Sequence, residues 1–350
     1  MALGSGSGKP RVGFGRLAAH ARAATLLPRS RDGLGLTWEQ LGEQDVPNLA
    51  RLVERVEHAD NVPFRTAPDE LLEYFTEYQE CQVVGARDED GELRAYGAVR
   101  AGMSTGGPVR AICSGDVDPD IRENGVGTAI LNWQLSAGKD LVHRLSGGQG
   151  GLVVVHVDDG RDDTRSLLTR MGFTEARAYV QLRRDLSLPI PDVELERNLR
   201  VEPWQEHLED AIRRAHNKAF EGSALTQQHS SESWEADRTF FVPQWSFVVL
   251  DRSSDRAQVA GYLMSSKYEQ DWPALGWTEG ATDLVGVLPP YRGRHVASAL
   301  LVAAMRAYRE AGLQYAGMDV DAADPAGAYD LATKLGFEAI HRSQAFAIEV

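Results

Sequence analysis

The strongest constraint in this sequence is an order of elements that occurs twice. Around Arg122 and again around Arg292, an apolar strand ends, a proline follows, and a turn leads into an amphipathic helix. The two arginines are 170 positions apart, and the Gly-Phe pairs at 172–173 and 336–337 are 164 positions apart. Such collinear repetition predicts two structural units of one kind, which also suits a length of 350 residues.

Each half alternates strand signals with helix signals in the same sequence. Short β-branched or apolar runs predict strands, and apolar residues at a period near 3.6 predict helices, as at Val126, Ile130 and Leu131. We therefore predict an α+β fold in which each unit has a mixed, mostly antiparallel sheet flanked by helices. The predicted strands are 82–86, 95–99, 109–117, 152–157 and 178–182 in the first half, and 245–250, 259–264, 282–287, 315–320 and 343–348 in the second.

The predicted domain boundaries follow from composition. Residues 1–34 form a flexible basic tail, which contains no acid before Asp32. The first unit is expected at 35–187, and a proline-stiffened linker at 188–198 joins it to a second unit at 199–350.

Charge and cysteine content exclude several function classes. The net charge is −14, and the six basic residues of the tail leave a body near −20, which argues against a nucleic-acid partner. No apolar run is long enough to span a bilayer, and no spacing suggests a metal site. Cys81 and Cys113 form no CxxC pair, which fits a reducing cytoplasm. The oligomeric state is left open.

The two strand-to-helix loops are suited to capturing an anion. Residues 122–127 read Arg-Glu-Asn-Gly-Val-Gly, and residues 292–297 read Arg-Gly-Arg-His-Val-Ala. A tight turn directs successive backbone N–H groups toward one point, and the helix N-terminus adds about half a positive charge. Small side chains let a phosphate group approach the backbone.

At this point the sequence resembles the GNAT superfamily of acyl-CoA-dependent N-acyltransferases. The matching features are Val-x-Pro followed by R-x-x-G-x-G/A, with His295 at the middle glycine position of the second half, then a strand, a helix and L-G-F, which is M-G-F in the first half. The second unit is the clearer match, with GVLPPYRGRHVASALL at 286–301 and DVDAADPAGAYDLATKLGFE at 319–338. The resemblance covers about residues 35–350 and is greatest to the tandem group that includes mycothiol synthase.

The resemblance implies acetyl-CoA as cofactor and a sheet in each unit that splays between its fourth and fifth strands. Pantetheine would enter that gap and pair with backbone of the strand before the loop, and the pyrophosphate would lie on the loop amides. The residues implied in the second unit are Val285, Gly286, Val287, Arg292, Gly293, Arg294, His295, Val296, Ala297, Ser298 and Asp324. Those implied in the first are Gly115, Val117, Arg122, Glu123, Asn124, Gly125, Val126, Gly127 and Thr128.

Two departures from the family pattern bear on this expectation. His295 stands where the middle glycine is usual, so we expect its backbone to avoid positive φ and the first loop to suit CoA better. Asp324 stands where an Asn is frequent after the fifth strand.

Transfer of an acetyl group to an amine requires a base for the ammonium proton. In this family the base is often a carboxylate on the strand before the loop, and the second unit has Glu279 and Asp283 there. Alternation predicts that Asp283, Val285 and Val287 share one face, with Glu279 on it too if the strand extends that far. The equivalent residues of the first unit are Val109 and Cys113, so chemistry is expected in the second. The alternative is that Asp283 only caps or pairs with a neighbouring strand.

The position of the usual thiol-protonating tyrosine holds Ala332 in the second unit and Leu168 in the first. Tyr329 lies one helical turn earlier and is a candidate acid, or else a packed helix-face tyrosine. The acceptor, a small-molecule amine, is expected near His216–Glu221, Trp234, Tyr268, Trp272 and Trp277. These side chains either bind the amine or pack in the hydrophobic core and at its edge.

Three functions stay open at this stage. The first is an acetyl-CoA-dependent N-acetyltransferase that acts on a small amine by direct attack on the thioester. The second is a non-catalytic tandem protein that binds acetyl-CoA or a partner. The third is an aminoacyl-tRNA-dependent ligase, which the acidic body disfavours.

Overall fold

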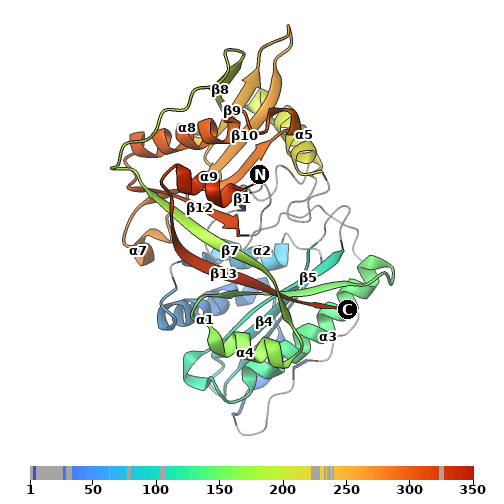
Figure 1. The fold of residues 1–350 in the computed structure, drawn as a ribbon. Coiled ribbons are helices and arrows are strands. Elements are labelled where there is room, and N and C mark those ends of the chain that lie inside the picture. Colours follow the sequence, from blue (N-terminus) through green and yellow to red (C-terminus); the bar gives the residue numbers. More distant parts are fainter. Residues whose placement is uncertain are drawn as a thin grey trace. The chain divides into compact units, whose positions relative to one another are not determined.

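The computed structural model describes residues 3–4, 27–28, 34–62, 64–76, 80–102, 108–221, 229–231, 234, 238, 240–322 and 327–350. The chain divides into two compact units (Figure 1). The N unit consists of residues 16–176 and 345–350, and the C unit consists of residues 1–15 and 177–344. Each unit thus includes a strand from the other half of the sequence. As a boundary between repeats, the 188–198 linker stays a prediction.

In the N unit, adjacent strands are antiparallel except for β5 and β6, which are parallel. The strands follow the order β2-β3-β4-β5-β6, and the end of β13 pairs beyond β6 through two 3.0 Å bonds between the backbones of Gly151 and Val350. The elements are β2 (Thr37–Gln40), α1 (Val46–Ala59), α2 (Pro68–Thr76), β3 (Cys81–Arg87), β4 (Leu93–Gly102), β5 (Val109–Val117), α3 (Val126–Ser146), β6 (Gly151–Asp158) and α4 (Asp162–Arg170).

The C unit repeats this arrangement in the order β7-β12-β11-β10-β9-β8, with β11 and β12 parallel. Its elements are β1 (Leu3–Gly4), β7 (Thr174–Asp185), β8 (Leu199–Pro203), α5 (Glu209–Ala219), β9 (Phe247–Asp251), β10 (Gln258–Ser266), α7 (Trp272–Leu275), β11 (Glu279–Val287), α8 (Val296–Glu310), β12 (Tyr315–Asp321), α9 (Ala328–Lys334) and β13 (Glu338–Glu349). Helices and mostly antiparallel strands in each unit confirm the predicted α+β class.

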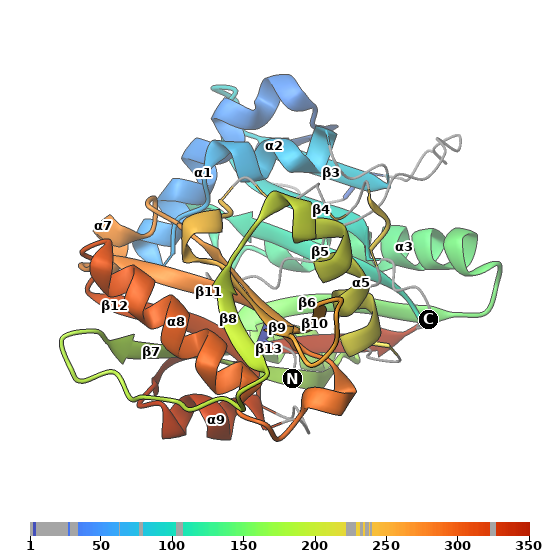
Figure 2. The same cartoon turned by 90° about the horizontal axis from the view of Figure 1, so that it is seen from above.

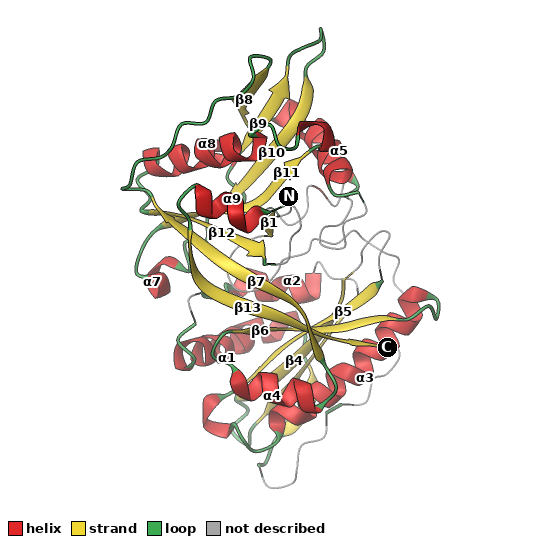
Figure 3. Ribbon diagram, in the orientation of Figure 1, coloured by secondary structure: helices red, strands yellow, loops and turns green. Residues whose placement is uncertain are grey.

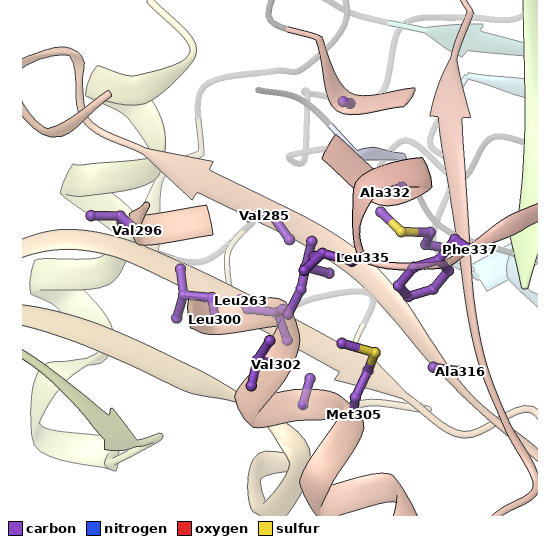
Figure 4. Close-up of a cluster of buried hydrophobic side chains, with 14 of the residues drawn as sticks. Leu263, Val285, Val296, Leu300, Val302, Met305, Ala316, Ala332, Leu335 and Phe337 are labelled. Atoms are coloured by element: carbon purple, nitrogen blue, oxygen red, sulfur yellow. The ribbon is translucent and has the colours of Figure 1, made fainter. Parts of the chain in front are cut away.

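In the C unit, α8 and α5 cover opposite faces of β10 and β11 (Figures 2 and 3). The apolar stripe of α8, including Leu300 and Met305, packs against Leu263 and Val285 (Figure 4). On the other face, Ile212 of α5 joins a second buried cluster. Burial of each such side chain contributes about 1.5–3 kcal/mol, so both faces of β11 are held firmly.

Within the residues that the structure describes, no helix has the length and apolar character needed to cross a membrane. The same residues include no group of three or more His, Cys, Asp or Glu side chains placed to hold a metal ion. Cys81 and Cys113 are free thiols, and both are buried.

Candidate functional site

The two strand-to-helix loops have the same backbone conformation. A short 3-10 helix, Pro119–Ile121 or Pro289–Tyr291, follows the strand, and the arginine after it is extended. The first and third residues after the arginine have left-handed backbone conformations. In the N unit these are Glu123, with φ of 64°, and Gly125, with φ of 80°. In the C unit they are Gly293, with φ of 74°, and His295, with φ of 61°. Each loop therefore places one glycine and one other residue in the left-handed region.

The expectation that His295 avoids positive φ was wrong. Its φ of 61° matches that of a glycine, because the residue must reverse the chain directly before α8 begins at Val296. The backbone conformation gives no reason for the first loop to bind CoA better, because Glu123 in that loop also has a strained left-handed φ. Strained residues of this kind often occur at binding sites, and both loops have one.

The first turns of α3 and α8 lie directly after these loops. The first amides of a helix have no acceptor within it, and they carry the positive end of its dipole. In α8 these residues are Val296, Ala297 and Ser298; in α3 they are Val126, Gly127 and Thr128. Both loops thus present backbone donors at a helix N-terminus, which is the geometry that binds phosphate.

The arginines that open the loops contact protein groups. Arg122 forms a bidentate pair with Asp60, at 2.6 and 2.9 Å, and its Nε donates to the carbonyl of Val117. Arg292 donates from Nε to the carbonyl of Val287 and from Nη2 to that of Ala219, at 2.8 Å. These bonds tie each loop to the preceding strand and to the C-terminal end of α1 or α5. A phosphate contact by either arginine stays a prediction.

Both parallel ladders stop before their strands do. The β11–β12 ladder runs from Glu279 to Thr282, yet β11 continues to Val287. The β5–β6 ladder runs from Val109 to Cys113, yet β5 continues to Val117. In the C unit, the further part of β12 pairs instead with the two residues of β1, Gly4 with Asp319 and Leu3 with Val320.

A β-bulge on β11 sets the orientation of Asp283. Met264 of β10 pairs with Leu284, whereas the next residue, Ser265, pairs with Thr282, so Asp283 is the extra residue. The predicted shared face for Asp283, Val285 and Val287 was therefore wrong. Val285 and Val287 pack toward α8, whereas Asp283 turns to the opposite face, where Leu284 joins the cluster that includes α5.

On that face Asp283 is held by hydroxyl groups. The Oγ of Ser266 donates to Oδ2 of Asp283, and the hydroxyl of Tyr268 lies 3.3 Å from the same oxygen. The bulge is also supported from the α8 side, where the Tyr308 hydroxyl donates to Ser265 and to the carbonyl of Ala281. The carboxylate of Asp283 thus has a defined direction.

Glu279 lies on the same face as Asp283, four residues earlier. Its carboxylate accepts a 2.9 Å hydrogen bond from Trp277 and lies over Gly317 of β12. Burial raises the pKa of this carboxyl, although the Trp277 hydrogen bond and the charge of Arg183 oppose the rise. The Arg183 guanidinium stacks on Trp277 and Tyr315, 4.1 and 4.4 Å from the ring centroids.

The N unit has no equivalent of this arrangement on its described strands. The β4–β5 register is regular from Ala95–Val117 to Gly102–Arg110, without a bulge. Cys113, which stands in place of Asp283, packs in the core beside Leu131 and Trp133. Burial raises the pKa of its thiol, so it is no base at neutral pH.

The predicted acceptor side chains form two groups. His216 is fully buried and hydrogen-bonds Tyr262, with Phe220 and Trp234 packed around it, so this group is a structural core under α5. Tyr268, Trp272 and Trp277 contact Asp283 or Glu279 instead.

The remaining site predictions have different outcomes. Tyr329 packs against the core of the C unit in the first turn of α9. Ala332 and Leu168, at the usual position of the acid, are buried apolar residues in the two cores. Asp324 lies outside the described residues.

Comparison with known proteins agrees with this geometry. Residues 207–337 match the family described as Acetyltransferase (GNAT) family. The chain contains a GNAT acetyltransferase domain. A mycothiol acetyltransferase of Nocardia farcinica is 28% identical over 271 residues, which cover 74% of this chain and 80% of the relative. Another, from Mycolicibacterium vanbaalenii, is 25% identical and covers 75% and 81%. With these relatives, the family match makes the chain an N-acetyltransferase.

Solved structures extend the likeness to both units. A GCN5-related N-acetyltransferase from Sphaerobacter thermophilus has a TM-score of 0.69 at 22% identity and covers 92% of this chain and 97% of its own. A tandem GNAT protein from the clavulanic acid biosynthesis pathway has a TM-score of 0.64 at 14% identity, with coverage of 90% and 98%. The whole chain therefore has the tandem GNAT fold.

Proposed function

We propose that the protein transfers the acetyl group of acetyl-CoA to the amine of a small molecule, and that the C unit performs the reaction. The observation that carries this proposal is the β11 bulge, which turns Asp283 away from the α8 core beside the place where the β11–β12 ladder ends. The N unit has a similar loop but neither the bulge nor the carboxylate.

The residues of the C unit fit acetyl-CoA in two respects. The loop of Gly293 and His295 presents amides at the start of α8, which suits a pyrophosphate. Beyond Thr282 the described part of the β11–β12 ladder leaves a strand edge, where we place pantetheine against Val285–Val287. We take this early end of the ladder as support for the predicted splay of the sheet. Acetyl-CoA would supply an acetyl group activated as a thioester.

Asp283 is the proposed general base. An amine reaches the reaction as an ammonium ion and must lose a proton before its nitrogen can form a bond to carbon. Asp283 would accept that proton first. The free amine nitrogen would then form a bond to the thioester carbon and release its second proton to solvent as the carbon–sulfur bond breaks. Glu279 would add negative charge that attracts the ammonium ion. The departing thiolate would take a proton from solvent or from Tyr329.

The acceptor class follows from the charges near Asp283 and from the named relatives. Asp283 and Glu279 share a face with Asp319 of β12, whose neighbours Met318 and Val320 pack in the opposite core. Such a face favours a cation. Because two relatives are named mycothiol acetyltransferases, a mycothiol-type amine is the first acceptor to test.

In the N unit we propose a CoA-binding or purely structural role for residues 115–128. Its loop shares the backbone conformation of the C-unit loop, and Cys113 offers no base. The two free thiols further support the expected reducing, cytoplasmic location. We retain the expectation that no nucleic acid is bound.

A screen of amines tests the proposed function. The full chain is incubated with acetyl-CoA and a panel of aminosugars, polyamines and amino-acid amines, and mass spectrometry detects products heavier by one acetyl group. We expect N-acetylation of at least one amine and its loss in Asp283→Asn. Saturable acetyl-CoA binding by calorimetry without any acetylated product would favour the non-catalytic alternative.

A further inference from the structure

The carboxylate of Asp283 is held by two hydroxyl groups from one short segment. Ser266 is the last residue of β10, and Tyr268 follows two positions later. Ser266 donates to Oδ2, and the Tyr268 hydroxyl lies 3.3 Å from Oδ2 and 3.4 Å from Oδ1. Both residues are buried, with exposed fractions of 4% and 7%. The two donors are therefore shielded and hold the carboxylate in one direction.

These contacts depend on the bulge. Without the register shift, Asp283 would stand opposite Ser265, whose side chain meets Tyr308 of α8. The extra residue moves Asp283 to the face of Ser266 instead. The bulge and the two hydroxyls thus form one arrangement that separates a carboxylate from the apolar core and gives it donors.

Two carboxylates, Glu279 and Asp319, share the face of Asp283 and disfavour its negative charge. Carboxylates close to one another favour the protonated form of each, whereas hydroxyl donors favour the ionised form. The ionisable groups on the elements that pack around β11 are Tyr268 after β10, Glu279 on β11, Asp319 on β12, Arg183 on β7, His216 on α5 and Tyr308 on α8. Arg183 is stacked on Trp277 and lies on the side of Glu279. Ser266 and Tyr268 are two donors that contact the Asp283 carboxylate.

We propose that Ser266 and Tyr268 are positioning residues that keep Asp283 ionised and aimed to accept the proton of the acceptor amine. This inference rests on the proposed function, because it assigns a role to the partners of the proposed base. Neither residue takes part in bond formation. Their contribution is to fix the direction of the carboxylate lone pairs and to stabilise its charge before the amine arrives.

The test compares Ser266→Ala and Tyr268→Phe with a matched control, Tyr74→Phe. Tyr74 lies on α2 of the N unit, where its hydroxyl is hydrogen-bonded to Ser114 at 2.8 Å, and it belongs to neither β10 nor β11. Thiol release from acetyl-CoA is followed from pH 4 to 9 with an acceptor found in the amine screen. Loss of one hydrogen bond to a charged group should move the acid limb of kcat/KM upward by about one pH unit.

We expect Ser266→Ala and Tyr268→Phe to show that shift with a lower kcat and a nearly unchanged KM for acetyl-CoA. Ser266→Thr, which keeps the hydroxyl, should restore the wild-type limb. Tyr74→Phe should leave the limb at its wild-type position. Wild-type pH profiles in both Ser266→Ala and Tyr268→Phe would overturn the inference, as would an equal shift in Tyr74→Phe.

The two proposals fail in different ways. If Asp283→Asn retains wild-type turnover, the proposed base is wrong and the positioning role falls with it. If Asp283→Asn loses turnover while the hydroxyl variants keep the wild-type acid limb, only the positioning role is refuted. Circular dichroism of each variant separates a misfolded protein from a folded protein with altered kinetics.

Discussion

The replacement Gly286→Ala tests how closely the protein packs around β11, the strand where we place pantetheine. A Cβ at this position would lie 2.2 Å from Cε1 and 2.8 Å from Cζ of Tyr262. The ring cannot move aside easily, because Tyr262 is fully buried and its hydroxyl is bonded to His216. Either the strand or the ring must shift.

Overpacking of this kind costs about 1–3 kcal/mol of unfolding free energy. For a unit of this size each kcal/mol lowers the melting temperature by roughly 2–4 °C, so a fall of roughly 2–12 °C is expected. Because the displaced backbone is the one that we assign to pantetheine, the Kd for acetyl-CoA should also rise. Thermal unfolding by circular dichroism and calorimetric titration measure the two effects.

A matched control is Gly127→Ala in the first turn of α3, where a Cβ would meet nothing closer than 3.9 Å. This variant should be as stable as the wild type or slightly more stable, since alanine favours a helix. The double variant Gly286→Ala/Tyr262→Leu, in which a smaller acyclic side chain replaces the tyrosine ring, should show a favourable coupling energy. A melting temperature and Kd for Gly286→Ala equal to those of the wild type would refute the reasoning.

Three further predictions concern the loops, the N unit and the first residues of the chain. His295→Gly should be about 1 kcal/mol more stable to denaturant than His295→Ala, because only glycine adopts a φ of 61° without strain, and equal stabilities would contradict the loop conformation. Burial alone would raise the pKa of Asp118, but the Asp120 amide and the guanidiniums of Arg94 and Arg55 outweigh it and lower that pKa. The ionised Asp118 carboxylate therefore stabilises the fold above about pH 4, and this stabilisation is lost as pH falls further. Asp118→Asn should lower the free energy of unfolding at pH 7 by about 1–3 kcal/mol and make stability less dependent on pH in the acid range. Urea titrations that show the wild-type dependence of stability on acid pH in Asp118→Asn would contradict this prediction. Deletion of residues 1–8 should lower the acetyl-CoA Kd at least about twofold, because Leu3–Gly4 pairs with β12 beside the strand edge where we place pantetheine. An unaltered Kd in calorimetry would show that residues 1–8 do not compete with acetyl-CoA.

Local signals in the sequence were sufficient for the element order and for both loops. The proline after each strand, the small residues and the apolar helix stripe all act within about ten residues, so Arg122 and Arg292 were found at equivalent positions. Repetition strengthened the interpretation, because each loop appeared in the same structural order.

The orientation of Asp283 could not be predicted in this way. Strict alternation assigns it the face of Val285, but the bulge depends on Ser265, Tyr308 and the register of β10, which are distant in sequence. The roles of Ser266 and Tyr268 follow from that bulge and were missed for the same reason. A tyrosine and a serine spaced by two residues give no signal by themselves.

Long-range partners account for the other differences. Arg122 pairs with Asp60, 62 positions earlier, and no local pattern links them. The positive φ at His295 results from the demand that the chain reverse before α8, which overrides the preference of the residue. The placement of residues 345–350 in the N unit likewise depends on pairing of β13 with a strand far away in sequence.

The most direct test of the central claim is a pair of measurements on Asp283→Asn at saturating acetyl-CoA: the rate of amine-dependent thiol release and the Kd for acetyl-CoA. We predict a loss of at least about 100-fold in the rate with a Kd close to that of the wild type, because the base is removed and the loop of α8 is untouched. An unchanged rate would contradict the assignment of Asp283, and a wild-type protein that does not bind acetyl-CoA would contradict the proposed function itself.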